Sequence, residues 1–240
     1  MLGIDRSGRL RAYYGDGAGR IGADQIIDAD WGTPGVLQFP MGDFTGDGYA
    51  DLGIVTAGGS FLIAKGDGSG FTAPVLLASQ WGVFDVVVSA LDWDGDGKVD
   101  VIGRTRGGDL WLYRGDGAGG WASKNGTLLA TGWGNSRPIP VGDFDGDGHD
   151  DLVALQTDGT LWLYRGDGAG GWASKNGSRI GHGWGAFVSV FSPGDFDGEP
   201  GTDLLARATD GSLYLYSGTR TGLSSAVRID SGWQTFSAIF

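Results

Sequence analysis

Asp143-Phe144-Asp145-Gly146-Asp147-Gly148-His149-Asp150-Asp151 has carboxylates at positions 1, 3, 5 and 9 and a glycine at position 6. Calcium takes six to eight oxygen ligands at about 2.3–2.6 Å, and a loop with a sharp glycine turn can supply them from alternate residues. The stretch therefore predicts a calcium loop. The next residues, Leu152–Gln156, are typical of a strand, and no glutamate follows at position 12, so the loop is not an EF-hand.

The spacing recurs three more times. In one copy Thr45 replaces a carboxylate, and in the last copy Glu199 and Pro200 occupy positions 5 and 6. Position 7 varies, as expected if only its backbone carbonyl binds the ion. The sequence predicts three calcium ions and leaves the last loop open. The predicted ligands are Asp43, Thr45, Asp47, Tyr49 and Asp51; Asp92, Asp94, Asp96, Lys98 and Asp100; Asp143, Asp145, Asp147, His149 and Asp151; and Asp195, Asp197, Glu199, Gly201 and Asp203.

Composition agrees with this interpretation. The chain has 29 acidic residues, of which only Glu199 is a glutamate, and half of the aspartates stand at the ligand positions. The formal net charge is -12. Without a basic patch to displace counterions from phosphates, nucleic acid is not an expected partner.

The loops set a repeat whose length is that of a propeller blade. They begin at residues 43, 92, 143 and 195, which gives intervals of 49, 51 and 52 residues. Each repeat reads as four short strands joined by tight turns, including Asp158-Gly159, and 49 glycines leave no sustained helical periodicity. We predict an all-β, five-bladed β-propeller of four-stranded antiparallel blades, with helix expected nowhere.

The two chain ends are expected to share one blade. Residues from Leu2 match a second strand, and Phe236–Phe240 match a first strand, so the C-terminal strand would complete the N-terminal blade and close the ring. The predicted single domain spans residues 1–240, with blades at residues 2–39 plus 235–240, 40–89, 90–139, 140–190 and 191–234.

The motif resembles a known repeat family. Asp-Phe-Asp-Gly-Asp-Gly followed by Asp-Leu, with a later Gly-Asp-Gly-Ala-Gly-Gly, is similar to the FG-GAP or VCBS repeats of integrin α-subunit propellers, which also occur in secreted bacterial proteins and calcium-containing propeller lectins. The resemblance covers nearly the whole chain. Such propellers usually have seven blades, so five would mean a compact ring like tachylectin-type lectins, a circular permutation, or a fragment that associates.

A tryptophan closes each repeat and is a candidate ligand-binding residue. By strand alternation these side chains should lie beside polar turns on the face opposite the calcium loops. An aromatic ring beside polar groups can hold the apolar face of a pyranose. The alternative is a tryptophan that only spaces the blades. The residues are Trp31, Trp81, Trp133, Trp184 and Trp233.

The leading functional prediction is a calcium-stabilised, multivalent carbohydrate-binding module, so a glycan is the expected partner. The competing prediction is a scaffold or protein-interaction domain, natural or built from duplicated blades, since residues 110–126 and 161–177 are identical. An enzyme is not expected, because His149 and His182 have no evident nucleophile beside them and no serine elbow or zinc signature occurs.

Location and assembly are expectations from the same features. No apolar run approaches the 18 residues that a membrane span needs. The first ten residues lack the apolar core of a secretion signal, so we expect any such segment to have been removed. Loops that bind calcium weakly suit extracellular fluid, so we expect a secreted or cell-surface protein. We also expect a monomer.

Overall fold

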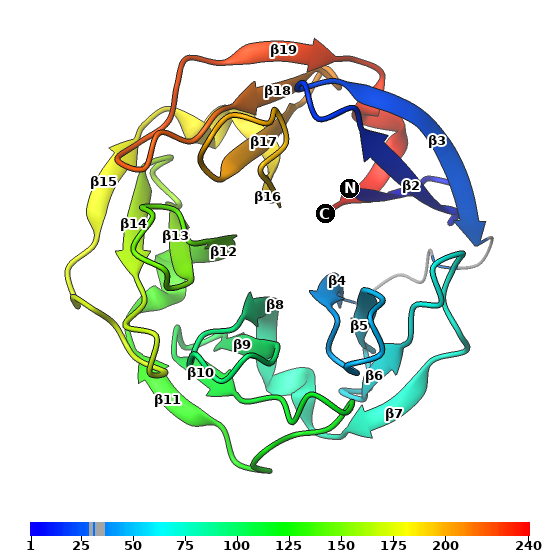
Figure 1. Ribbon diagram of the computed structural model, residues 1–240, viewed down its shortest axis with the longest axis vertical. Coiled ribbons are helices and arrows are strands. Elements are labelled where there is room, and N and C mark those ends of the chain that lie inside the picture. The colour runs from blue at the N-terminus through cyan, green and yellow to red at the C-terminus, as the bar shows by residue number, and fades with distance from the viewer. Residues whose placement is uncertain (29–30, 32–36) are drawn as a thin grey trace.

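Five four-stranded antiparallel sheets, the blades, stand around a central axis in the computed structural model, which describes residues 1–28, 31 and 37–240 (Figure 1). This confirms the predicted fold class. In each blade the first strand lines the axis and the fourth lies at the rim (Figure 1).

The strands follow the same order in every blade. Blade 1 consists of β20 (Phe236–Ile239), β1 (Leu2–Asp5), β2 (Leu10–Gly15) and β3 (Ile21–Asp28). Blade 2 consists of β4 (Leu37–Gly42), β5 (Asp51–Val55), β6 (Phe61–Ala64) and β7 (Val75–Ala78). Blade 3 consists of β8 (Phe84–Leu91), β9 (Asp100–Thr105), β10 (Leu110–Tyr113) and β11 (Thr127–Ala130). Blade 4 consists of β12 (Ser136–Gly142), β13 (Asp151–Gln156), β14 (Leu161–Arg165) and β15 (Ser178–Gly181). Blade 5 consists of β16 (Phe187–Gly194), β17 (Asp203–Ala208), β18 (Leu213–Tyr216) and β19 (Val227–Asp230).

The ring closes through the two ends of the chain, as predicted. Strand β20 pairs antiparallel with β1, with Gly3 opposite Ile239. The backbone N–H of Leu2 donates to the carbonyl of Phe240 at 2.8 Å, and that of Phe240 donates back at 3.0 Å. Because these bonds satisfy the inner edge of β1, blade 1 has the same four-stranded form as the others.

Blades begin a few residues before the predicted repeat boundaries. Blade 3, for example, starts at Phe84, because the first strand runs directly out of the segment that follows the tryptophan. That segment is a one-turn 3₁₀ helix at Trp81–Val83, Trp133–Asn135, Trp184–Ala186 and Trp233–Thr235. The expectation of no helix was therefore wrong at these four links, where a single turn redirects the chain from the rim to the axis. No helix in the described ranges is long and apolar enough to cross a membrane.

The core lies between neighbouring blades. Second strands are buried on both faces, as in β5, where all five residues are buried. In β10 the burial alternates, with Leu110 and Leu112 buried and Trp111 and Tyr113 partly buried. Each sheet thus packs one face against the preceding blade and the other against the next, which is how a repeat that cannot bury its apolar surface alone becomes stable.

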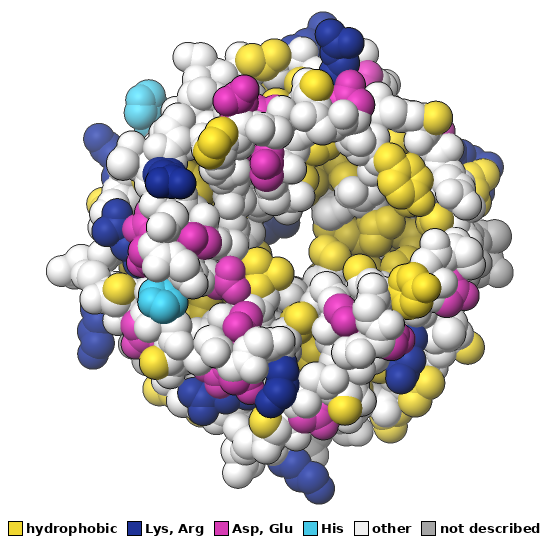
Figure 2. Space-filling model, viewed as in Figure 1, with side chains coloured by type: hydrophobic (Ala, Val, Ile, Leu, Met, Phe, Trp, Pro, Cys, Tyr) yellow, Lys and Arg dark blue, Asp and Glu magenta, His cyan; other side chains and the backbone are white. Residues whose placement is uncertain are grey.

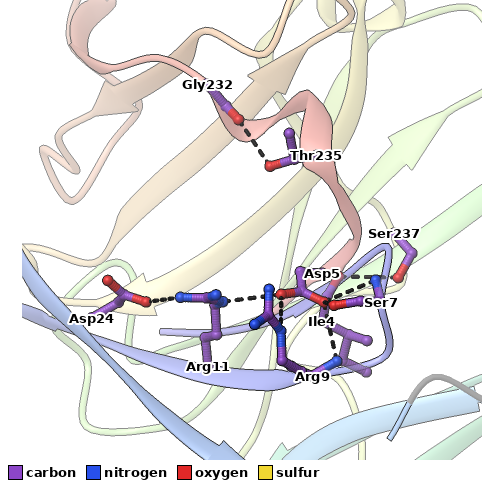
Figure 3. A network of polar contacts seen from close by, with 9 residues as sticks. All are labelled: Ile4, Asp5, Ser7, Arg9, Arg11, Asp24, Gly232, Thr235 and Ser237. Carbon is purple, nitrogen blue, oxygen red and sulfur yellow. Dashed lines mark hydrogen bonds and ion pairs between the residues drawn. The ribbon is translucent and has the colours of Figure 1, made fainter. Parts of the chain in front are cut away.

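Blade 1 holds a polar network at the turn between β1 and β2 (Figure 3). Asp5 accepts hydrogen bonds from the Ser7 hydroxyl at 2.6 Å, from the Arg9 side chain at 2.9 Å and from the Arg11 side chain at 3.1 Å. Arg11 also pairs with Asp24 of β3. These donors, led by Ser7, lower the pKa of Asp5. The network joins β1, β2 and β3 of the blade that contains both chain ends.

Candidate functional site

The aspartate at position 9 of each loop begins the second strand and is buried at 0–1% exposure in Asp51, Asp100, Asp151 and Asp203. In blade 4, Asp151 accepts from the backbone N–H of Gly166 through Oδ1 and from that of Phe144 through Oδ2, both at 3.1 Å. Asp203 and Asp51 bond in the same way within their blades. This carboxylate therefore fastens the loop to the turn after the third strand, a role that the sequence reading had not given it.

Burial raises the pKa of these carboxyl groups. The pKa of Asp100 and that of Asp151 rise to about 7, mainly by desolvation and further by the nearby Asp94 and Asp145. The pKa of Asp51 and that of Asp203 rise for the same first cause. A cation in the loop would act in the opposite direction, since a nearby positive charge favours the ionised carboxylate.

Acids at positions 1 and 5 are bonded inside their own loops. Asp143 accepts from the backbone N–H groups of Gly146, Asp147 and Gly148, and Asp147 accepts from that of His149. The other loops repeat parts of this pattern at Asp43, Asp47, Asp92, Asp96 and Asp195, where Tyr49 and Lys98 supply the position-7 N–H groups. In the last loop Glu199 instead donates its N–H to Asp197, and Gly201 has φ +143°.

Position 3 faces a residue at the end of the third strand. Asp94 pairs with Arg114 and Asp145 pairs with Arg165, each with 2.6 Å between the arginine Nε and a carboxylate oxygen. In blade 5, Asp197 accepts from the Ser217 hydroxyl at 2.5 Å. The position-3 acids therefore already have a partner on one oxygen.

Three loops bring three carboxylates together. One ligand atom from each acid lies within 4.8 Å of the others in the groups Asp92, Asp94 and Asp96; Asp143, Asp145 and Asp151; and Asp195, Asp197 and Asp203. The last group belongs to the loop that the sequence had left open. In the Asp43 loop Thr45 stands at position 3, and its buried hydroxyl has no hydrogen-bond partner in the described part of the chain.

The blade 3 loop has the strongest need for a ligand. Within the described residues, Asp92 Oδ1, Asp94 Oδ1 and Asp100 Oδ2 are all buried without a hydrogen-bond partner. Unpaired buried oxygens are costly, and several on one loop fit the all-oxygen shell that calcium prefers. Thus the donor set and its geometry fit a calcium ion, although the assignment of the predicted ligands stays a prediction.

The five tryptophans do lie beside the predicted turns. Trp133 donates its backbone N–H to Gly108 at 2.8 Å, and Trp31, Trp81, Trp184 and Trp233 make the same bond to their own turns. Gly108 needs to be glycine, because its φ is +86° and a Cβ would lie 2.3 Å from the backbone nitrogen of Gly134. Turn and link are therefore in direct contact at each blade junction.

The tryptophan rings, however, are buried at 3–7% exposure rather than open to solvent. Trp81 stacks on Trp121 with 5.5 Å between ring centroids and lies 4.6 Å from the ring of Tyr113. Each of the five rings therefore belongs to one of the hydrophobic clusters of the core. Ligand binding by these residues stays a prediction, which the structure supports best at Trp133, whose ring lines a pocket.

A pocket of about 480 Å³ lies at the junction between blades 3 and 4. Blade 3 contributes β11 and the link up to Trp133, and blade 4 contributes the opposite wall. Trp133 and Trp172 stack nearly parallel, at 13° and 5.9 Å, with the ring of Tyr164 4.8 Å from Trp133. The polar side chains in the lining are Thr131, Ser136, Gln156 and Lys175.

The pocket exists where a serine replaces a phenylalanine. The third residue after the link tryptophan is Phe84, Phe187 or Phe236 at three other junctions, and each phenylalanine ring lies 5.0–5.6 Å from its tryptophan. At the junction between blades 3 and 4 this residue is Ser136, whose hydroxyl donates to Gln156 at 2.9 Å. Sequence reasoning missed Ser136, although aligning the repeats on their tryptophans would have singled it out.

Comparison with protein families agrees with the fold. A model described as FG-GAP-like repeat matches residues 43–102, 92–154 and 143–206, which together span more than half of the chain. The chain belongs to the FG-GAP-like repeat family. The matched segments begin at three of the aspartate loops, so the loops that define the repeat also carry its membership in the family. No curated protein matches the sequence.

Solved structures share the propeller fold at low sequence identity. The BP39L lectin from Burkholderia pseudomallei superposes with a TM-score of 0.54 and 19% identity, over 95% of this chain and 65% of that chain. AofleA from Arthrobotrys oligospora superposes with a TM-score of 0.50 and 15% identity, over 93% of this chain and 70% of that chain. The Tc holotoxin pore of Photorhabdus luminescens superposes with a TM-score of 0.52 and 16% identity, over 95% of this chain and 11% of that chain. This chain thus spans just under two thirds of the BP39L lectin and a small part of the toxin.

Proposed function

We propose that this protein is a carbohydrate-binding propeller and that the pocket between blades 3 and 4 is its binding site. The observation that carries the proposal is Ser136 at a position where the other described junctions place phenylalanine. The serine exchanges an apolar contact for a cavity with a hydroxyl in its wall. The other described junctions are filled by a phenylalanine, whereas the junction between blades 3 and 4 contains a pocket.

The composition of the pocket supports a sugar as the ligand. The aromatic wall of Trp133, Tyr164 and Trp172 is suited to the apolar face of a pyranose ring. Gln156 accepts from Ser136 through Oε1, so its amide N–H groups can donate to sugar hydroxyls, and Lys175 adds an ammonium at the rim. The volume of about 480 Å³ lies within the usual range for small-molecule sites.

One open site is proposed among the four junctions whose link segments lie within the described residues. Phe84, Phe187 and Phe236 fill the equivalent space at other junctions, so multivalent binding would require several copies of the chain. The BP39L lectin, by its name a lectin, has the same propeller fold, which is compatible with the proposal at 19% identity. No catalytic role is proposed, and His182 is exposed on the link outside the pocket lining.

A glycan array with three forms of the protein tests this function. The natural chain should bind a limited set of glycans, and Ser136→Phe should lower that binding at least about tenfold by filling the pocket. Ser178→Phe, the same substitution on the exposed outer strand β15, should bind like the natural chain. Absence of glycan binding by a normally folded natural chain would contradict the proposal and favour the scaffold. Equal binding by Ser136→Phe would place the site elsewhere.

Calcium is proposed as a structural ion in the loops of blades 3, 4 and 5. Support comes from the three carboxylate groups and from the unpaired buried oxygens of Asp92, Asp94 and Asp100. When bound, the ion would neutralise acids that otherwise repel one another and would stabilise the folded state by mass action. A millimolar requirement would fit the secreted or cell-surface location that we propose.

Calorimetric titration of calcium into chelator-treated protein tests the ion separately from the sugar. We expect saturable binding and a higher melting temperature with calcium than with chelator, whereas magnesium, which demands a smaller octahedral shell, should do less. An unchanged melting temperature in excess chelator and no heat of calcium binding would contradict the assignment.

A further inference from the structure

Arg104 in blade 3 and Arg207 in blade 5 occupy the same place in their blades and make the same interblade contacts. Arg104 Nη1 donates to the carbonyls of Trp133 at 3.4 Å and Ser136 at 2.5 Å. Arg207 Nη1 donates to the equivalent carbonyls of Trp233 at 2.8 Å and Phe236 at 2.7 Å. In both blades the guanidinium therefore ties the second strand to the link of the next blade.

The two arginines differ in their counter-ion. In blade 3, Asp85 of β8 accepts from Arg104 Nε at 3.0 Å and from Nη2 at 2.9 Å, which is a bidentate pair. The equivalent residue of β16 in blade 5 is Val188. Arg207 is only 9% exposed, and its Nε is buried without a hydrogen-bond partner in the described part of the chain. Burial, aided by the charge of Arg6, lowers the pKa of Arg207.

Arg207 lines a channel of about 690 Å³ along the propeller axis, bounded by the first strands of all five blades. A second guanidinium in its wall is that of Arg137 on β12, which is exposed. Much of the remaining wall is apolar, including Val86, Val88 and Pro140. Figure 2 shows the central hollow, with hydrophobic side chains on part of its wall.

We propose that this channel binds an organic carboxylate with an apolar body. The carboxylate would pair with the Arg207 guanidinium as Asp85 pairs with Arg104, and Arg137 would add a second positive charge. The apolar body would lie along Val86, Val88 and Pro140. Arg104 is paired with a carboxylate, and the equivalent buried Arg207 is not. The group that Arg207 lacks is therefore a carboxylate. This site is separate from the pocket at Ser136 and does not depend on the carbohydrate proposal.

Three probes separate the charged head of such a ligand from its apolar chain. Octanoate has the carboxylate and the chain, acetate has only the carboxylate, and octanol has only the chain. Titration calorimetry should show saturable binding of octanoate, with acetate and octanol each at least tenfold weaker. Binding of all three probes with equal affinity would overturn the proposal, as would no saturable binding of octanoate.

Val188→Asp supplies the carboxylate that blade 5 lacks, and Val188→Asn is its uncharged control of similar shape. We expect Val188→Asp to weaken octanoate binding at least tenfold and to raise the melting temperature. Val188→Asn should bind within threefold of the natural chain, and Arg137→Gln should lose about threefold. Octanoate binding that is unchanged in folded Val188→Asp would show that Arg207 is only an interblade tie and would overturn the assignment. Glycan binding should be unaffected by these variants, so the two sites can fail independently.

Discussion

The junction between blades 2 and 3 and the junction between blades 3 and 4 are built from almost the same side chains. In the first, Trp81 stacks on Trp121 at 5.5 Å and lies 4.6 Å from Tyr113, and in the second, Trp133 relates to Trp172 and Tyr164 at 5.9 and 4.8 Å. Even the lysine at the rim is repeated, as Lys124 and Lys175. The outer strands read Val-Leu-Leu-Ala and Thr-Leu-Leu-Ala.

The closed junction has a phenylalanine at the position where the open one has a serine. Phe84 is 7% exposed and lies 5.1 Å from Trp81 and 5.9 Å from Tyr113, so it fills the space between blades. Ser136 at the same position is much smaller and leaves the pocket. The two junctions therefore share an aromatic frame, and they differ in whether a phenylalanine or a serine stands beside it.

The largest expected effect comes from opening the closed junction. Phe84→Ser removes a buried ring and leaves a hydroxyl in its place, which should lower the free energy of unfolding by about 4 kcal/mol. Urea denaturation monitored by tryptophan fluorescence measures this change in the free energy of unfolding. If the aromatic frame and a serine are enough for a site, this variant should also gain glycan binding. A loss below about 1 kcal/mol would show that Phe84 does not fill the junction.

The loops of blades 3 and 4 extend the comparison to the other face of the ring. Asp100 has an unpaired buried oxygen, whereas both oxygens of Asp151 accept backbone hydrogen bonds. The pKa of Asp100 is about 7 when folded, against 3.8 without burial, so between pH 4 and pH 7 the folded state holds a proton that the unfolded state has lost. Stability without calcium should therefore fall as pH rises through this window and level off above it.

Asp100→Asn removes that titration. The difference in pH dependence between the natural chain and the variant should be about 2 kcal/mol after solvent screening is allowed for. Denaturation in chelator from pH 4 to pH 8 measures it. Saturating calcium should flatten the profile of the natural chain, because the ion lowers the pKa of Asp100, and an equally steep profile with calcium would argue against an ion in this loop.

Closing the open junction should change stability less. Ser136→Phe is expected to raise the free energy of unfolding by about 1 kcal/mol, since it buries apolar surface but leaves Gln156 without the Ser136 hydroxyl. Thermal unfolding beside the glycan array gives both readouts on one sample. Strong destabilisation would mean that the backbone around residue 136 differs from that around Phe84.

The smallest effect is expected at the rim. Lys175→Ala should weaken glycan binding about threefold by removing one charge-assisted hydrogen bond, and Lys124→Ala at the closed junction should leave it unchanged. The two lysines lie in identical sequence contexts, so the pair controls for changes in net charge. Equal losses in both variants would point to a general electrostatic effect rather than a contact in the pocket.

Much of the fold and part of the site were predictable from the sequence. The aspartate spacing gave the repeat, Leu2 and Phe236 indicated how the ring closes, and the strand pattern placed Trp133 beside the turn at Gly108. The one-turn helices were missed because the link has no local signal beyond Trp-Gly. Burial of the tryptophan rings was not evident, since strand alternation gives the face of a sheet but not the neighbouring blade that covers it.

By itself the sequence determined what depends on residues close together in the chain: the turns that need glycine, the carboxylates spaced for one loop, and strands short enough for blades. Only the tertiary structure decided which described junction is open, that Arg104 pairs with Asp85 whereas Arg207 Nε has no hydrogen-bond partner among the described residues, and that Asp100 keeps an unpaired oxygen. These outcomes depend on side chains from different strands and blades. Their contacts are set by how the sheets pack around the axis and not by local conformational preference.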